Sequence, residues 1–143
     1  MANEGPLQHW GWGISGFDAR NSSVTGTTLS GPNGSAQFLA VKMSTVALTV
    51  SLTTGSGERM MGLLQNKPST GIAADVGYQG FSKAVAGATI TPGVELMVSS
   101  TAAGTLIPAT TGLYAIGRSI NGAAVGEVFD AYLFGNGGSS LNA

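Results

Sequence analysis

The sequence contains no cysteine and a single histidine, His9, and these absences exclude several kinds of chemistry. Without cysteine, the chain forms no disulfide, offers no thiolate to a metal and has no cysteine nucleophile. One histidine is too few for a histidine-based zinc site within one chain. A Ser-His-Asp triad would have to use His9, which lies in a glycine-rich segment, whereas a catalytic base needs rigid positioning. We therefore interpret His9 as a packing or contact residue.

Charged residues are also scarce, at 9% of the 143 residues, against about 25% in an average soluble domain. The lysines and arginines are scattered along the chain and the formal net charge is −1. A basic patch that binds nucleic acid through counterion release is therefore not expected. A surface with so little charge gives weak electrostatic protection against self-association and is compatible with burial against a partner.

Long apolar runs are missing as well, since none approaches the roughly 18–20 residues of a membrane-spanning helix. The first residues, MANEGPLQHW, lack the basic region and apolar core of a secretory signal. We expect a protein that is made in a cytoplasm and has no membrane partner.

The carboxylates do not suggest an enzyme. Glu127 and Asp130 are three apart on an expected strand, so their side chains should point to opposite faces and not form the facing pair of a glycosidase. Asp75 and Glu95 are interpreted as solvated strand ends. Residues 11–16 match G-x-G-x-x-G, but the flanking sequence lacks the strand and helix of a dinucleotide site. No catalytic residue, cofactor or metal is expected.

Glycine and apolar residues are abundant, with 23 glycines and 43% hydrophobic residues, and turn signals recur roughly every 8–12 residues. Val50 and Leu52 end a strict apolar-polar alternation that begins at residue 46, which is typical of a half-buried strand. This spacing predicts an all-β sandwich or barrel with few or no short helices. The expected strands are 38–44, 46–52, 59–64, 72–78, 81–85, 94–98, 106–109, 113–120 and 125–134.

The composition divides the chain into three zones. They are an extended arm rich in Gly, Ser and Thr (1–36), the β-barrel-like body (37–134) and a flexible tail (135–143). The arm holds Trp10, Trp12 and Phe17, which so short and glycine-rich a segment is not expected to bury by itself. Because aromatic residues are enriched at interface hot spots, we expect them to dock on another subunit. The alternative is that the arm folds back onto the chain's own body.

Residues 60–80 form the most definite segment of the body. An apolar run is interrupted at Pro68, which biases its predecessor toward extended geometry, and Gly71 suits a turn that needs a positive φ. A second apolar-polar alternation then begins. The pattern predicts a strand, a tight reversal and another strand.

Within this segment, residues 62–68, GLLQNKP, resemble the G-hydrophobic-L-Q-N-K-P signature of small head-decoration, or capsid cement, proteins of tailed bacteriophages. The resemblance continues in residues 88–94 (ATITPGV), 114–118 (YAIGR) and 126–133 (GEVFDAYL). It covers about residues 45–134, with the motifs in the order typical of these proteins.

The resemblance implies a small β-barrel-like or β-tulip-like body with an extended N-terminal arm. It also implies a structural protein of the virion, not an enzyme, made in the host cell cytoplasm. Such a protein decorates the outer capsid surface, often as a homotrimer, and holds neighbouring subunits of the major capsid protein together against the pressure of the DNA. It binds neither nucleic acid nor membrane directly. The expected contacts with the capsid or a neighbouring copy are Trp10, Trp12, Phe17, His9 and Arg20.

Two other classes of function remain open from the sequence. The chain could be a carbohydrate-binding or host-surface-binding β-module of a virion or secreted assembly, because exposed tryptophans can stack on sugars. A hydrolase is the least favoured class, since the single histidine and scattered carboxylates provide no convincing site.

Overall fold

The structure is a computed structural model that describes residues 14–18, 36–45, 49–67, 73–135 and 140–141. These residues form strands joined by turns and contain no helix, so the predicted all-β class is confirmed. In this described part of the chain, no helix is long and apolar enough to cross a membrane.

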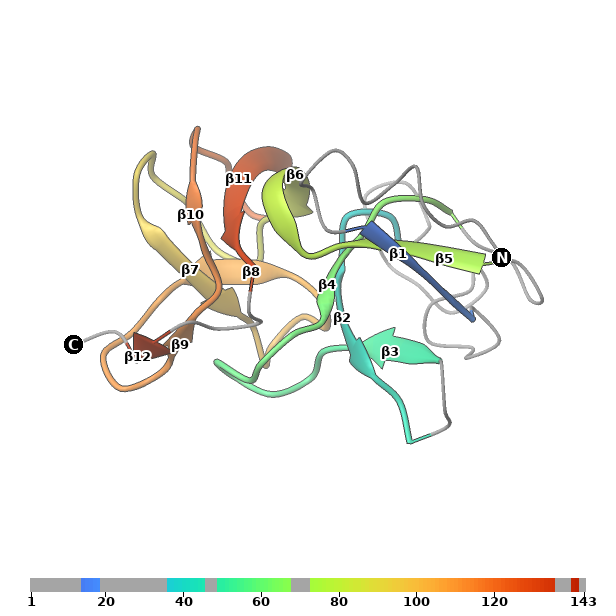
Figure 1. Cartoon of the computed structure of the whole chain (residues 1–143). Helices are drawn as coiled ribbons and strands as arrows, with labels where there is room; N and C mark the ends of the chain where they lie inside the picture. The colour runs from blue at the N-terminus through green and yellow to red at the C-terminus, as the bar shows by residue number, and fades with distance from the viewer. Residues whose placement is uncertain (1–13, 19–35, 46–48, 68–72, 136–139, 142–143) are drawn as a thin grey trace.

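The strands form two five-stranded sheets and one small sheet of two strands (Figure 1). The first sheet has the order β1-β5-β4-β2-β3, and the second has the order β6-β11-β10-β7-β8. The strand bounds are β1 Ile14–Asp18, β2 Ala40–Met43, β3 Val50–Leu52, β4 Gly62–Leu64, β5 Ala73–Gly77, β6 Gln79–Val85, β7 Glu95–Val98, β8 Leu106–Pro108, β9 Tyr114–Ala115, β10 Gly117–Ser119, β11 Val128–Phe134 and β12 Ser140–Leu141. Paired strands run antiparallel throughout the described sheets.

The two large sheets are open, which differs from the barrel-like closure that we expected. The reason lies between β5 and β6, which are separated by Tyr78 alone. The chain passes directly from the first sheet into the second and bends along β6, which pairs with β11 instead of returning to the first sheet (Figure 1). Gln79 and Gly80, expected to separate two strands, belong to β6 and pair with residues at the end of β11.

The strand-reversal-strand prediction for residues 60–80 is confirmed in its described part. β4 and β5 are antiparallel neighbours, with Leu63 opposite Gly77 and Leu64 opposite Val76. Both leucines are fully buried. Gly62 is required by close approach, because a Cβ atom added there would lie 2.4 Å from the carbonyl oxygen of Gly77. The GLLQNKP segment therefore contains β4, a short strand that packs closely against β5.

The hydrophobic core consists of two clusters, and each joins the two large sheets. In one cluster, Leu63 of the first sheet packs with Phe129 and Leu133 of β11. In the other, Val85 of β6 packs with residues of the first sheet, including Val76. Because side chains from each sheet contribute to the core of the other, the sheets stabilise one another.

The predicted alternation before Leu52 is also confirmed where it is described. Val50 and Leu52 are buried in β3, whereas Ser51 between them is only partly covered. Residues 46–48 lie outside the described residues, and β3 is correspondingly shorter than the expected strand.

Two strands come from the zones outside the predicted body. β1, within the 1–36 zone, pairs with β5 along its whole length and forms one edge of the first sheet. β12, within the 135–143 zone, pairs with β9. Backbone pairing with the body therefore extends into both terminal zones.

Candidate functional site

The side of the second sheet that faces solvent carries an aromatic face, defined by Phe81 of β6 and by Tyr132 and Phe134 of β11. Tyr132 is directly opposite Phe81 in the strand register, and their ring centroids are 5.3 Å apart in an edge-to-face arrangement. The Phe134 ring lies 6.4 Å from that of Tyr132. Phe81 is 62% exposed and Tyr132 is 40% exposed, which is unusual for large apolar side chains that contact one another.

The two-residue period of β11 explains why this face exists. Phe129, Ala131 and Leu133 point into the core and are buried, so the side chains between them must point outward. Tyr132 and Phe134 occupy outward positions. The strand therefore has apolar side chains on both faces, one for the core and one facing solvent.

Charged residues flank the aromatic face in opposite pairs. Lys83 Nζ lies 3.0 Å from Asp130 Oδ1, and Arg118 lies 3.4 Å from Glu95. These side chains are largely exposed, so each pair contributes little to stability. Their charges cancel, which leaves the face without a net charge from these two pairs.

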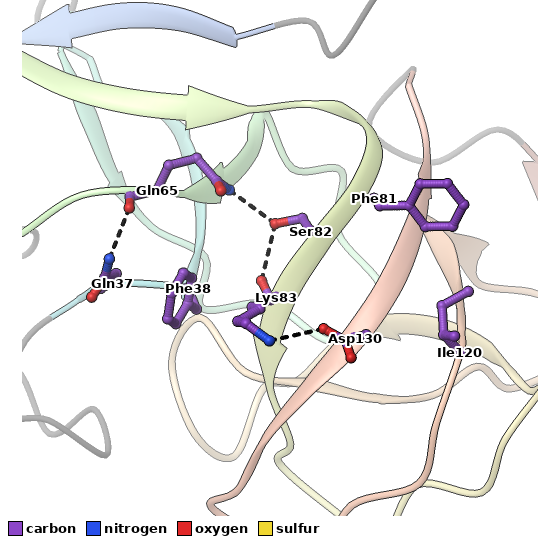
Figure 2. A pocket seen from close by; sticks show the side chains of 8 residues that line it. All are labelled: Gln37, Phe38, Gln65, Phe81, Ser82, Lys83, Ile120 and Asp130. Atoms are coloured by element: carbon purple, nitrogen blue, oxygen red, sulfur yellow. Dashed lines mark hydrogen bonds and ion pairs between the residues drawn. The ribbon is translucent and has the colours of Figure 1, made fainter.

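A pocket of about 530 Å³ adjoins the aromatic face where the two sheets meet. Figure 2 shows Phe81 and Ile120 on one side of it, Phe38 on the other, and the Lys83–Asp130 pair between them. The pocket therefore combines apolar side walls with a charged but internally neutralised floor.

Gln65, the glutamine of the GLLQNKP segment, supports this pocket from the first sheet. Its side-chain amide donates a 2.9 Å hydrogen bond to Ser82 Oγ of β6 (Figure 2). The same amide donates a second hydrogen bond, also of 2.9 Å, to the Leu63 carbonyl. The backbone carbonyl of Gln65 accepts a 2.9 Å hydrogen bond from the side-chain amide of Gln37. The segment is thus a structural bridge between the two sheets.

The structure places only part of the residues that the sequence singled out as partner contacts. His9, Trp10, Trp12 and Arg20 lie outside the described residues. Phe17 lies in β1, where its backbone is opposite Ala74 of β5. These contacts with a capsid or a neighbouring copy stay predictions.

Two carboxylates occupy different places from those expected. Glu127 precedes β11 and lies in a turn, where its carboxylate accepts a 2.8 Å hydrogen bond from the Ala124 amide. The turn includes Gly126 with a φ of 85°, so the strand that the sequence pattern predicted from residue 125 begins only at Val128. Asp75 lies in the middle of β5 and not at a solvated end. Among the described residues, no three His, Cys, Asp or Glu side chains gather as metal ligands.

The surroundings of Glu58 shift the pKa of its carboxyl group. Partial burial by itself raises the pKa of Glu58, but hydrogen bonds from the Gly55 and Thr54 amides and from the Lys42 ammonium outweigh it and lower the pKa below its ordinary value. The Lys42–Glu58 distance is 3.1 Å. These contacts close the loop between β3 and β4, so we interpret the cluster as structural.

We predict that Glu58→Gln lowers the free energy of unfolding by about 1 kcal/mol at pH 7, because the charged acceptor is lost. Because the folded-state pKa is depressed, this stabilisation is present above the unfolded-state pKa and disappears as pH falls through the folded-state value. Urea unfolding of both proteins between pH 7 and pH 3 measures it. Glu95→Gln, at the exposed 3.4 Å pair, is the control with a smaller effect. A difference independent of pH would contradict the assignment.

The aromatic face and Phe38 were not found from the sequence. One pattern in the sequence could have predicted the aromatic face. In residues 128–134 the apolar side chains occupy both alternating faces of the strand, whereas a strand with one solvated face needs apolar side chains on only one. Phe38 carried no such signal. Its place in the pocket depends on a turn in which its backbone has a φ of 71°.

Comparison with known proteins relates this chain through structure. No family model matches the chain, and neither does any curated protein sequence. A solved structure, the head fiber gp8.5 N base of bacteriophage phi29, has a similar fold, with a TM-score of 0.62 and 14% sequence identity. The match covers 89% of this chain and 99% of that chain. The expected likeness to phage head proteins is thus confirmed at the level of the fold, which this chain shares with the base of a bacteriophage head fiber.

Proposed function

We propose that this protein is a structural component of a tailed-bacteriophage virion that binds the outer capsid surface and holds neighbouring major capsid subunits together, without catalysis. The observation that carries the proposal is the fold, which matches that of a phage head fiber base over nearly all of both chains. The signature segment, identified independently in the sequence, agrees with it. Since one fold serves many functions, contact with the capsid needs its own physical argument and test.

The aromatic face supports the proposal as a contact surface. Tyr132 lies at its centre, in contact with Phe81 on one side and Phe134 on the other. Tyrosine and phenylalanine are enriched in interface cores, and hot spots cluster near the centre of an interface. The ion pairs lie at the edge of the face, where they keep their partners and their water when a contact is centred on Tyr132.

Association of several copies would strengthen such contacts. We propose that the protein acts as a homotrimer, because linked copies that bind equivalent sites on a regular shell gain avidity without new contacts. The arm, including Trp10 and Trp12, provides a second set of contacts through aromatic side chains. An edge strand such as β3 is also a place where a partner strand can pair.

The test is binding to purified capsids that lack the protein. We expect the full chain to co-sediment with them in a saturable way and to raise the temperature at which they release DNA. Tyr132→Ser is expected to weaken binding about 30-fold, the loss typical of a central hot-spot residue. Met43→Ser, an equally exposed apolar residue of the first sheet, is the matched control and should bind normally.

The arm is tested separately by deletion of residues 1–13. This deletion removes His9, Trp10 and Trp12 but keeps β1, which pairs with β5, so the first sheet stays intact. Loss of capsid binding by a folded variant supports the arm contacts. Saturation of capsids by the deleted protein at wild-type concentrations would contradict them, and failure of the full chain to co-sediment would refute the capsid function.

A further inference from the structure

The pocket beside the aromatic face has the dimensions of a ligand site. Ligand pockets in proteins usually have volumes of about 300–1,000 Å³, and this one measures about 530 Å³. Its apolar walls are Phe38 on one side and Phe81 with Ile120 on the other (Figure 2). Ile120 is 49% exposed, so this wall is open to an incoming ligand.

Phe38 is held in this wall by a strained turn. Its φ of 71° lies in the left-handed region, where glycine or asparagine is usual. The turn is fixed by a hydrogen bond from the Leu39 amide to the Ala36 carbonyl and by one from the Phe38 amide to the Leu64 carbonyl. An aromatic residue at such a position is the kind of backbone outlier that marks functional sites.

The floor of the pocket presents a hydrogen-bond donor beside an acceptor. Lys83 Nζ lies 3.0 Å from Asp130 Oδ1, and the two side chains are 54% and 47% exposed. An ammonium has three protons and a carboxylate accepts up to about four hydrogen bonds, so the ion pair leaves capacity on both groups. Asn121 holds Asp130 in place, because its side-chain oxygen accepts a 2.8 Å hydrogen bond from the Asp130 amide and its Nδ2 donates a 3.4 Å hydrogen bond to Asp130 Oδ2. The carboxylate keeps acceptor capacity beyond these bonds.

This combination selects among classes of ligand. An apolar side chain would strip water from the ion pair without replacing its hydrogen bonds, which is unfavourable. A charged ligand would find the two charges already neutralised by each other. A sugar avoids both costs, since its C–H faces pack on aromatic rings while neighbouring hydroxyls, each a donor and an acceptor, bond to Lys83 and Asp130.

We infer that the pocket between Phe38 and Phe81 binds a neutral saccharide unit. This function does not rest on capsid binding. Because Phe81 lines the pocket and also belongs to the aromatic face, a sugar and a capsid subunit would compete for this side chain. The inference also differs from the sugar-stacking role considered for the tryptophans of the arm, because it uses residues of the folded body.

The inference is tested by titrating the ¹⁵N-labelled full chain with neutral malto-, cello- and chito-oligosaccharides and recording amide chemical shifts. At least one series is expected to shift the amides of Phe38, Lys83 and Asp130. The dissociation constant should be on the order of 1 mM, because an open pocket leaves much of the ligand in water. No shift with any series at tens of millimolar would overturn the inference.

Variants separate the pocket from other sugar contacts. Phe81→Ser and Asp130→Asn, both at exposed positions, should each weaken binding about tenfold by removing a wall or an acceptor. Phe38→Gly should also weaken binding, although it relaxes the turn. Met43→Ser on the first sheet is the control and should bind like the wild type.

Two further outcomes would overturn the inference. One is wild-type affinity in both Phe81→Ser and Asp130→Asn, because the sugar would then bind elsewhere. The other is preferential binding of an anionic oligosaccharide, because the neutralised floor should not favour it. Since the titration uses the protein alone, its result is independent of the capsid co-sedimentation experiment.

Discussion

Replacement of Gly62 by alanine is expected to lower the free energy of unfolding by about 3 kcal/mol, since overpacking against backbone cannot be relieved by a rotamer change. The added Cβ would lie 2.4 Å from the Gly77 carbonyl oxygen and 2.7 Å from Val76 Cγ1. Both atoms belong to β5, so β4 and β5 would have to separate. Leu63 and Leu64, the buried residues of β4, would move with the strand.

Urea unfolding followed by circular dichroism measures this effect as a shift in the transition midpoint. Gly55→Ala is the matched control, because the nearest atoms to its added Cβ lie 3.3 Å away and belong to the Glu58 side chain, not to backbone, so a shift of a few tenths of an ångström relieves the contact. We expect the control to change stability by about 1 kcal/mol or less. Equal effects of the two substitutions would show that the contact between β4 and β5 does not restrict position 62.

Phe129→Ala is expected to cost about 3–5 kcal/mol, the range for loss of a buried phenylalanine. Phe129 is 1% exposed and lies in the cluster that joins β11 to Leu63 and Leu96. Its removal would leave a cavity between the two sheets that the surrounding backbone cannot fill by moving. Because the sheets stabilise one another through this cluster, we expect one cooperative transition at a lower denaturant concentration.

Phe81→Ala provides the comparison, since it deletes the same side chain from an exposed position of the neighbouring strand. Phe81 is 62% exposed, and its ring packs edge to face with that of Tyr132. We expect a loss of about 1 kcal/mol or less. A loss as large as that of Phe129→Ala would mean that the aromatic face is part of the folding core and not a surface available for binding.

The sequence predicted those elements whose signals are local. The β4–β5 pair was found because an apolar run, a proline and a glycine follow one another within about twenty residues. The pairing of the last two expected strands was found because Asn121-Gly122 is a strong turn signal between apolar segments, and β10 and β11 do pair as antiparallel neighbours. In both cases the partners are close in the chain. The expected strand 113–120, however, is divided into β9 and β10, which belong to different sheets.

Elements that depend on distant partners were not predictable in the same way. The expected barrel became two open sheets because β6 pairs with β11, from which it is separated by more than forty residues of sequence. The sequence pattern placed Glu127 in a strand because its neighbours are apolar. In the structure Glu127 lies in a turn that its own carboxylate stabilises, and β11 begins only after this turn.

The candidate site illustrates the same division. Phe38 belongs to the chain segment before β2, Phe81 to β6 and Asp130 to β11, and they form one pocket only after the two sheets have packed. The sequence could place aromatic residues on strands. It could not show that Phe129 and Leu133 of β11 face the core while Tyr132 faces solvent. That choice depends on which face the first sheet covers.

The sequence alone was enough to predict an all-β fold, to exclude disulfides and thiolate sites, and to place a strand at Gly62–Leu64 in a chain with little charge. These properties follow from composition and from side-chain period, which act over a few residues. The tertiary structure alone decided that the strands form two sheets, that Gln65 bridges them and that aromatic rings gather on one exposed face. These features result from contacts between residues far apart in the chain, whose formation depends on the packing of the whole core.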